Sequence, residues 1–211
     1  MPKVICLDFD GPIVNSLGPN IEFGLRMKEK YQGPKPLPPA DHIIEWKKLV
    51  VFPMVAMFQN LGFSKEQAQY IHDHDYLEEF GNQRNPAPLH EGMQHIIRRL
   101  RDDGNRLAIV SLNYRCNILA SLGELANSFE VIHSFNEFPE KPAALIDAAK
   151  RLGTTPEQAI YVGDSISDHH AARAVKMPFF GVSYGWQITG DEPEFVSAKT
   201  PRELESMLTY Y

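Results

Sequence analysis

Five short apolar runs set the strongest constraint on how this chain can fold, since each has the composition of a buried strand. They lie at residues 4–7, 107–110, 131–132, 159–162 and 179–182. Polar and apolar residues do not alternate within the runs, which is typical of strands buried on both faces of a parallel sheet. Helical patterns separate them, so the sequence predicts an α/β fold built on a Rossmann-like, doubly wound parallel sheet.

Helices with one apolar face are expected in the part of the chain that carries these runs. They cover about residues 91–102, 117–126 and 142–152. A last helix is expected to begin at Thr200, an N-cap residue followed by proline at the first helical position. Glu203 is expected to complete a capping box with Thr200.

Residues 17–86 interrupt the alternation of strands and helices, because they show no convincing strand pattern. Helical segments are expected there at about residues 19–31, 41–51, 54–61 and 65–80. A helical stretch of this length is too long for a simple crossover between two parallel strands. The sequence therefore predicts an all-helical insertion at 17–86 in a core of residues 1–16 and 87–211, with hinge-like segments at 15–18 and 82–88.

The composition excludes several classes of function. The net charge is −6 and the sequence pI is about 5.7, which disfavours nucleic acid and anionic membranes as partners. The longest apolar run is interrupted by Pro53 and is shorter than the roughly 18 residues that a membrane span needs. Two cysteines cannot form a disulfide framework, and charged Asp8 and Asp10 precede any apolar leader segment. We therefore expect a soluble protein of the cytoplasm.

Chemically reactive side chains follow the predicted strands. In an open parallel sheet, ligands bind beyond the carboxyl ends of the strands. The residues found there, or at the start of the next helix, are Asp8, Asp10, Ser111, Asn113, Lys141, Asp164 and Asp168. Each alone has an ordinary explanation, such as a turn former or a helix cap. Their joint placement at successive strand ends predicts an active site.

These residues resemble the four motifs of the haloacid dehalogenase superfamily of phosphohydrolases. Residues 8–11 are similar to the first motif, Ser111 to the second, Lys141 with Pro142 to the third, and residues 163–168 to the fourth. The resemblance covers the whole core, including residues 181–185 in the last core strand and the loop after it. The helical insertion falls where the phosphoglycolate phosphatase-like branch carries a helical cap of the C1 type.

This resemblance implies a Mg²⁺-dependent phosphatase that hydrolyses a small phosphate monoester through an aspartyl phosphate. Asp8 would be the nucleophile, and Asp10 would protonate the leaving alcohol and then activate water. Asp8, the main-chain carbonyl of Asp10 and Asp164 would bind the metal ion. Asp168 would belong to the same metal site, where it would orient a metal-bound water or pair with Lys141.

The remaining site residues are expected to bind the phosphoryl group. Lys141, Ser111 and Asn113 would hold its oxygens, where negative charge develops. The acid at Asp10 favours phosphoryl transfer over dehalogenation, because a halide leaving group needs no proton. The resemblance makes phosphoglycolate the first substrate candidate, followed by sugar and nucleotide monophosphates. The sequence does not indicate the oligomeric state.

Two other functions stay open from the sequence. A phosphomutase of the β-phosphoglucomutase type would use the same residues and pass the phosphoryl group from Asp8 to a second sugar hydroxyl. A non-catalytic sensor of a phosphorylated ligand would use the fold for binding alone. The four carboxylates argue against the sensor, because a pure binder gains nothing from placing negative charges around an anion.

Several weaker signals lie outside the motifs. The run at residues 72–75 alternates His and Asp, but consecutive residues point around a helix, which favours a solvated face over a metal site. His169 and His170 follow Asp168, and their expected role is surface exposure or packing. Tyr184 and Trp186 could border the substrate or pack under their loop. Four basic residues of the insertion could meet an anionic substrate: Arg26, Lys47, Lys48 and Arg84.

Overall fold

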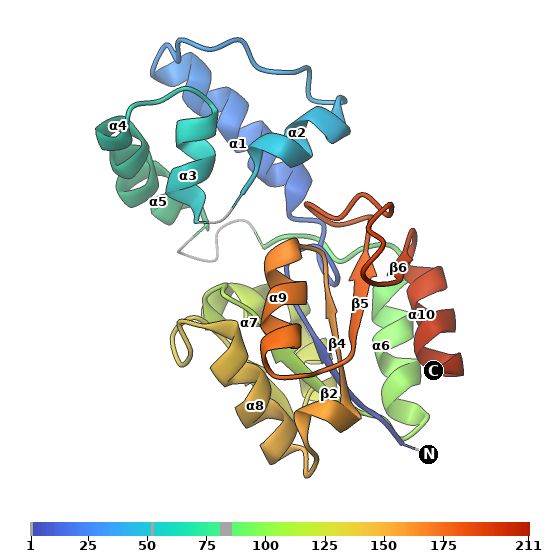
Figure 1. The fold of residues 1–211 in the computed structure, drawn as a ribbon. Helices are drawn as coiled ribbons and strands as arrows, with labels where there is room; N and C mark the ends of the chain where they lie inside the picture. Colours follow the sequence, from blue (N-terminus) through green and yellow to red (C-terminus); the bar gives the residue numbers. More distant parts are fainter. Residues whose placement is uncertain (1, 52, 81–85) are drawn as a thin grey trace. The chain divides into compact units, whose positions relative to one another are not determined.

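The computed structural model describes residues 2–51, 53–80 and 86–211. The chain divides into two compact units, Met1–Asn15 with Pro88–Tyr211 and Ser16–Ala87. The first contains the sheet and the second is helical (Figure 1). Residues 82–85 of the second expected hinge, and Arg84 with them, lie outside the described residues.

The sheet of the first unit has six parallel strands in the order β3-β2-β1-β4-β5-β6. The strands are β1 (Val4–Leu7), β2 (Arg106–Val110), β3 (Val131–His133), β4 (Ala159–Gly163), β5 (Phe179–Val182) and β6 (Ser197–Ala198). The strand order reverses between β1 and β4, where an open α/β sheet forms its ligand site. This confirms the predicted α/β fold class. The sequence missed β6, whose two residues form no apolar run.

Helices cover both faces of the sheet (Figure 1). They are α6 (Met93–Asp102), α7 (Arg115–Leu122), α8 (Lys141–Arg151), α9 (Ile166–Ala174) and α10 (Pro201–Tyr210), with 3-10 turns at Gly123–Ser128 and Pro156–Gln158. Thr200 caps α10 by accepting a hydrogen bond from the Glu203 amide at 3.1 Å. Glu203 reaches back to the amide of Lys199 at 2.7 Å, so the expected capping box forms only in part.

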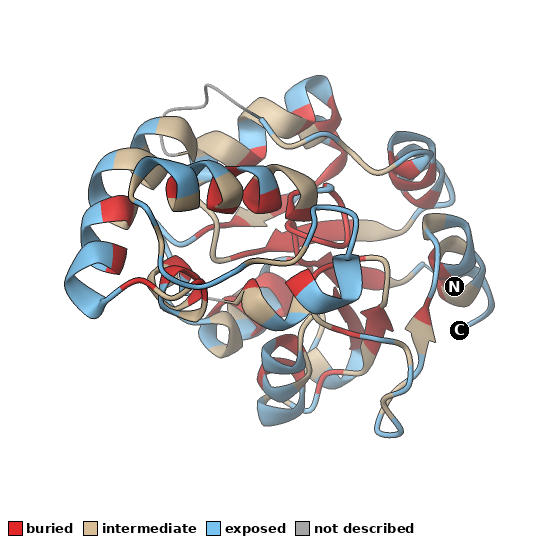
Figure 2. Cartoon of the chain, turned by 90° about the horizontal axis from the view of Figure 1, so that it is seen from above, coloured by how far each residue is buried: buried red, intermediate tan, exposed pale blue. Residues whose placement is uncertain are grey.

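Most residues of the strands are buried, as the red colour in Figure 2 shows. Successive side chains of a strand point to opposite faces of the sheet, so they pack against opposite layers of helix. Val4 and Cys6 of β1 belong to one cluster with Leu145 and Ala148 of α8. Ile5, which alternates with them, is fully buried on the other face. Non-alternating apolar strands are therefore the sequence signature of this sheet.

The second unit is built from helices, and its described residues form no strand. It contains α1 (Leu17–Lys30), α2 (Ile43–Leu49), α3 (Met54–Asn60), α4 (Lys65–Tyr70), a π-helical segment (Ile71–Tyr76) and α5 (Leu77–Phe80). The helix expected over residues 65–80 is present, but a π-helical turn occupies its middle, which periodicity in the sequence does not show.

Aromatic packing and ion pairs hold the helical unit together. The ring of Phe23 lies 5.8 Å from that of Phe58 and 5.5 Å from that of Tyr76. Arg26 and Glu79 form an ion pair of 2.5 Å between α1 and α5. Arg26, which the sequence offered as a substrate contact, is thus paired within its own unit.

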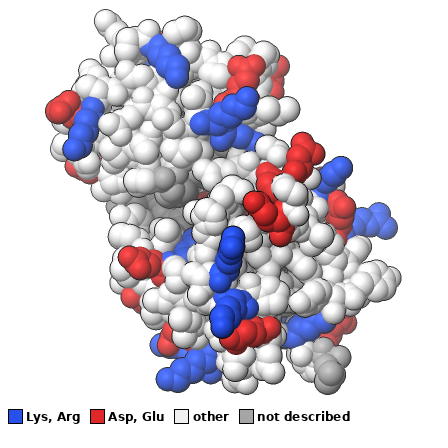
Figure 3. All heavy atoms as spheres, viewed as in Figure 1, with Lys and Arg blue, Asp and Glu red and all other residues white. Residues whose placement is uncertain are grey.

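Acidic and basic side chains lie interspersed on the face shown in Figure 3. Some pair across elements, such as Arg106 with Glu130 at 2.5 Å and Arg115 with Glu137 at 3.3 Å. These four side chains are exposed, so each pair contributes about 0–1 kcal/mol to stability. Among the residues described, no helix has the length and apolar character needed to cross a membrane.

Candidate active site

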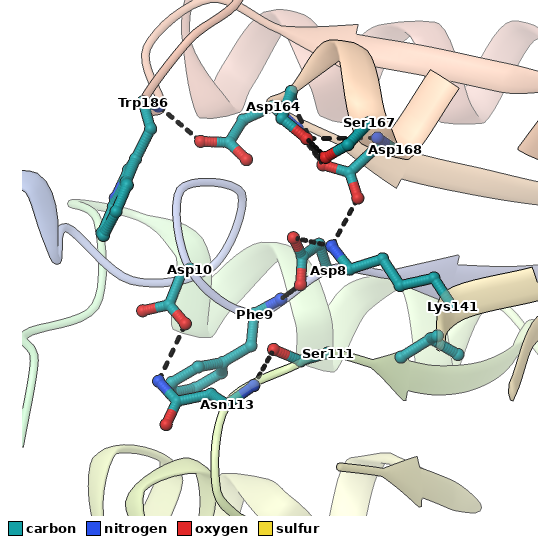
Figure 4. Close-up of polar contacts among 12 residues, drawn as sticks. Asp8, Phe9, Asp10, Ser111, Asn113, Lys141, Asp164, Ser167, Asp168 and Trp186 are labelled. Atoms are coloured by element: carbon teal, nitrogen blue, oxygen red, sulfur yellow. Dashed lines mark hydrogen bonds and ion pairs between the residues drawn. The ribbon is translucent and has the colours of Figure 1, made fainter. Parts of the chain in front are cut away.

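The strand register brings the predicted site residues to one edge of the sheet (Figure 4). Leu7 of β1 aligns with Ile109 of β2 and with Val162 of β4. The residues that follow these strands therefore emerge side by side. Asp8 is tied to β4, because its amide donates a 2.8 Å hydrogen bond to the carbonyl of Val162.

Lys141, the first residue of α8, links two of the carboxylates. Its Nζ lies 2.6 Å from Oδ2 of Asp8 and also forms an ion pair with Oδ1 of Asp168. Burial alone would lower the pKa of Lys141, but the negative charges of Asp168 and Asp8 outweigh this effect and raise the pKa above its ordinary value. The lysine is therefore a permanent cation at the centre of the site.

The surroundings of Asp8 disfavour its charged form. Burial raises its pKa to about 7, a shift that Lys141 opposes and that the charges of Asp168 and Asp10 reinforce. Its Oδ1 accepts a 2.7 Å hydrogen bond from the amide of Phe9. A positively charged partner beyond Lys141 would keep this carboxylate ionised at neutral pH.

Three buried carboxylates form the candidate metal centre. Ligand oxygens of Asp8, Asp164 and Asp168 lie within 4.8 Å of one another, and theirs is the one such group among the described residues. Burial, together with the charges of Asp168 and Asp8, raises the pKa of Asp164 well above its ordinary value. One lysine cannot balance three carboxylates, so the donor set suits a divalent cation that prefers oxygen ligands. The run at residues 72–75 contributes no group of this kind.

The loop after β5 holds Asp164 in place. Its Oδ2 accepts a hydrogen bond from the Trp186 amide, and its main-chain oxygen accepts one from the Ile188 amide at 2.8 Å. A Cβ atom on Gly11, whose φ is +91°, would lie 2.0 Å from Oδ2 of Asp164. A Cβ on Gly185 would lie 2.4 Å from the Asp164 Cβ. Both positions therefore require glycine while Asp164 keeps this place.

Asp168 has both carboxylate oxygens occupied. Its Oδ2 accepts hydrogen bonds from the Ser165 hydroxyl at 2.6 Å and from the amides of Ser165 and Asp164 at 3.1 and 3.3 Å. Its Oδ1 contacts Lys141 and accepts a 3.0 Å hydrogen bond from the hydroxyl of Tyr161. These contacts favour a role in orienting neighbours over direct metal ligation.

Tyr161 is a site residue that the sequence reasoning missed. The sequence places it in the apolar run at residues 159–162, and its side chain is fully buried. A tyrosine in an otherwise aliphatic strand does indicate a polar neighbour, because a buried hydroxyl needs a hydrogen-bond partner. Here that partner is Asp168.

Ser111 and Asn113 lie beside the loop that carries Asp10. The hydroxyl of Ser111 accepts a hydrogen bond from the Asn113 amide at 3.1 Å. The side-chain amide of Asn113 donates a 2.8 Å hydrogen bond to Oδ2 of Asp10 (Figure 4). Asn113, predicted as a phosphate ligand, thus has an acidic partner in this structure.

The aromatic residues near the site have packing roles. The ring of His169 lies 4.8 Å from that of Phe195 and 5.4 Å from that of Phe179. Trp186 is buried, and Tyr184 donates a 3.1 Å hydrogen bond to the carbonyl of Pro12. Packing under the loop is therefore the interpretation that the contacts support for Tyr184 and Trp186.

Residues 5–182 match the model of the haloacid dehalogenase-like hydrolase family. The chain belongs to this family. The match confirms the resemblance drawn from the motifs at Asp8, Ser111, Lys141 and Asp164.

Individual relatives agree with this assignment. The chain is 29% identical over 209 residues to a phosphoglycolate phosphatase from Nitrosococcus oceani, covering 92% of each chain. A haloacid dehalogenase-like hydrolase from Streptococcus pneumoniae has the same fold, with a TM-score of 0.78 at 20% identity, and the match covers 100% of this chain and 99% of that one. A crystal structure described as a predicted phosphoglycolate phosphatase from Haemophilus somnus gives a TM-score of 0.76 at 19% identity and 98% coverage of each chain. The chain is a phosphoric monoester hydrolase of this family, as the sequence predicted.

Proposed function

We propose that this hydrolase is a Mg²⁺-dependent phosphatase that cleaves a small phosphate monoester through a phosphorylated Asp8. The observation that carries the proposal is the contact of Asp8 with Lys141 inside a group of three buried carboxylates. Asp10 lies two residues further along the same loop and is also buried. The site therefore combines a nucleophile, an acid and a cation.

Asp8 and Asp10 divide the reaction into two steps. In the first, a carboxylate oxygen of Asp8 attacks phosphorus, the bond to the leaving oxygen breaks, and Asp10 donates a proton to that oxygen. In the second, Asp10 accepts a proton from the water that attacks phosphorus. Inorganic phosphate leaves, and the Asp8 carboxylate is restored.

Lys141 and Ser111 are the proposed ligands of the transferring phosphoryl group. The ammonium group of Lys141 contacts Oδ2 of Asp8. Negative charge that develops on the phosphoryl oxygens when Asp8 attacks would therefore lie beside a fixed cation. The Ser111 hydroxyl accepts the Asn113 amide and can still donate its own hydrogen to a phosphoryl oxygen.

The proposed Mg²⁺ ligands are Asp8, Asp164 and the main-chain carbonyl of Asp10, with Asp168 placing Lys141 or a metal-bound water. When bound, the ion supplies positive charge that offsets the repulsion between Asp8 and an incoming phosphate. The raised pKa values of Asp8 and Asp164 agree with this assignment, because burial and the neighbouring carboxylates disfavour the charged forms and a bound cation would offset both effects.

Phosphoglycolate is the first substrate candidate, on the strength of the relative from Nitrosococcus oceani, with sugar and nucleotide monophosphates next. We propose that residues 17–86 act as the cap domain and the rest of the chain as the catalytic core. A cap can exclude bulk water and select the substrate by its non-phosphate part. Two free cysteines, Cys6 and Cys116, support the proposed cytoplasmic location.

The test is phosphate release from a panel of metabolite phosphates and one aryl phosphate, measured with Mg²⁺ and with a chelator. Release should require the metal and should be lost in Asp8→Asn, which keeps the shape of the side chain but not its nucleophilic oxygen pair. Circular dichroism of the variant serves as the folding control.

Two results would contradict the proposal. An Asp8→Asn protein with normal activity would exclude Asp8 as the nucleophile. An isomeric phosphate ester in place of inorganic phosphate would identify a mutase.

A further inference from the structure

The loop after β2 carries an amide that contacts the proposed acid of the reaction. Nδ2 of Asn113 lies 2.8 Å from Oδ2 of Asp10, although the two residues are far apart in the sequence. Both belong to the sheet-containing unit, and both side chains are shielded from solvent, Asp10 the more so. Figure 4 shows the amide of Asn113 directed at the Asp10 carboxylate.

Two donors fix which end of the Asn113 amide faces Asp10. Its Oδ1 accepts a 2.7 Å hydrogen bond from the backbone amide of Tyr114 and a 3.0 Å hydrogen bond from Nδ2 of Asn117. Turning the amide over would set its NH₂ group against both donors and its oxygen against a carboxylate. The contact with Asp10 is therefore a hydrogen bond donated by Asn113.

The backbone of Asn113 is anchored as well. Its amide donates to the hydroxyl of Ser111 at 3.1 Å, and its carbonyl accepts a hydrogen bond from the amide of Phe135 at 3.0 Å. Asn117 approaches from the first turn of α7. The donor that meets Asp10 is thus held by the ends of two strands and by a helix.

We propose, on the basis of the phosphatase function above, that Asn113 is a positioning residue that orients the Asp10 carboxyl for proton transfer, and that Asn117 holds Asn113 in place. Because the Asn113 amide donates to Oδ2, a proton carried by the Asp10 carboxyl belongs on its other oxygen, from which it passes to the leaving group in the first step and to which it returns from water in the second. The hydrogen bond persists in both steps, since Oδ2 can accept it whether or not the other oxygen carries a proton. Proton transfer depends steeply on such placement.

This role differs from the phosphate-binding role that the sequence predicts for Asn113. A phosphate ligand would act on every substrate alike, because all share the phosphoryl group. A residue that positions the acid acts in phosphorylation of Asp8 only where the leaving oxygen needs a proton. An alkyl phosphate needs it, whereas 2,4-dinitrophenyl phosphate does not, because its phenolate is a good leaving group.

The experiment compares these two substrates in single turnovers of the full-length enzyme with Mg²⁺. Acid quenching gives the rate at which the enzyme becomes phosphorylated, separately from the later hydrolysis. In Asn113→Ala we expect this rate to fall roughly 10- to 100-fold with the alkyl phosphate and to change by less than about twofold with 2,4-dinitrophenyl phosphate. Inhibition by inorganic phosphate should be unchanged.

Two further variants complete the design. Asn117→Ala should show the same substrate-dependent pattern with a smaller loss, and it keeps the test decisive if Asn113→Ala does not fold. Asn136→Ala is the matched control, because Asn136 is an exposed asparagine that accepts the amide of Arg115 at the start of α7 without reaching Asp10. It should match the wild type with both substrates.

The outcomes separate this proposal from the one on which it rests. Equal losses with both substrates, or weaker inhibition by inorganic phosphate, would overturn the positioning role and return Asn113 to phosphate binding or structure. Unchanged rates in both Asn113→Ala and Asn117→Ala would overturn it too. A wild-type enzyme that hydrolyses both substrates without becoming phosphorylated would instead contradict the proposed mechanism.

Discussion

The ammonium group of Lys141 lies between Asp8 and Asp168, and at the scale of single residues this contact sets the charge balance of the site. Removing a partner from such a buried pair leaves an uncompensated charge, which costs more than the pair itself contributes. Tyr161 adds a neutral donor to Asp168 at 3.0 Å. Tyr161 of β4 thus fixes the Asp168 carboxylate, which in turn positions Lys141.

Replacing Tyr161 by Phe tests this arrangement, because it removes one hydroxyl and keeps the ring. We expect the free energy of unfolding to fall by about 1 kcal/mol, the usual value for a lost hydrogen bond. Turnover should fall several-fold, since Asp168 then places Lys141 less tightly. Urea denaturation and steady-state kinetics measure the two effects.

The exposed Tyr210 offers the control, and Tyr210→Phe should change neither quantity. Wild-type stability and turnover in Tyr161→Phe would show that the hydroxyl does not support the site.

The positions of the acidic residues and the lysine were predictable at this scale, because they follow strand ends or begin a helix. The hydrogen-bond partner of the Asn113 side chain was not predictable from the sequence. The direction of its amide depends on Tyr114 and Asn117, which are close in sequence, and on Asp10, which only the strand register brings near. The sequence contains no local sign of that register.

At the scale of elements, the loop after β5 determines where Asp164 lies. The Trp186 amide donates a hydrogen bond to the Asp164 carboxylate, and the absence of a side chain at Gly185 leaves the space that Asp164 occupies. The motif resemblance predicted this loop as part of the core. Its contact with Asp164 comes from the backbone, so side-chain identities alone could not show it.

Gly185→Ala should displace Asp164, because the new Cβ would lie 2.4 Å from the Cβ of Asp164. We expect the apparent affinity for Mg²⁺ to fall roughly 10- to 100-fold, the range seen when groups that orient metal ligands are lost. Activity should recover in part at high Mg²⁺. Titration of activity with Mg²⁺ measures the shift.

Gly18 provides a matched comparison within α1, where an added Cβ would meet nothing within 4 Å. Gly18→Ala should leave the Mg²⁺ dependence unaltered. An unchanged Mg²⁺ titration in Gly185→Ala would mean that Asp164 is not a metal ligand or that the loop moves aside freely.

The helical unit contains both elements that the sequence predicts and one that it does not. Its helices were expected because prolines and apolar periodicity mark them, and Ser64 with Gln67 forms the N-cap of α4. The π-helical segment Ile71–Tyr76, in which hydrogen bonds join residues five apart instead of four, was not expected from the sequence.

For the whole molecule, the crowded carboxylates link stability to pH and to metal binding. The pKa of Asp8 is about 7 in the folded chain and lies near 3.8 when the group is unperturbed. The folded state therefore binds more protons than the unfolded state between these values, and stability falls as pH rises across this interval. A metal ion that binds only the folded chain acts in the opposite direction.

Unfolding of wild type and Asp8→Asn in urea with a chelator tests this linkage. From about pH 5 to about pH 7, the variant should become progressively more stable relative to the wild type, because it lacks the titrating carboxyl. Mg²⁺ should raise the stability of the wild type more than that of the variant. A difference that stays constant with pH would contradict the account of Asp8.

The fold of the whole molecule was predictable because its buried strands and its helical segment have distinct apolar patterns. The family match over residues 5–182 agrees with that reading. The central claim, however, concerns one oxygen atom: that the phosphoryl group passes through the carboxylate of Asp8.

The most direct measurement is to quench the enzyme in acid during turnover, reduce it with borohydride and locate the product by mass spectrometry. Reduction converts an aspartyl phosphate to homoserine. The account predicts substrate-dependent homoserine at position 8, absent from Asp8→Asn. Homoserine at another position, or full phosphatase activity with none formed at position 8, would contradict it.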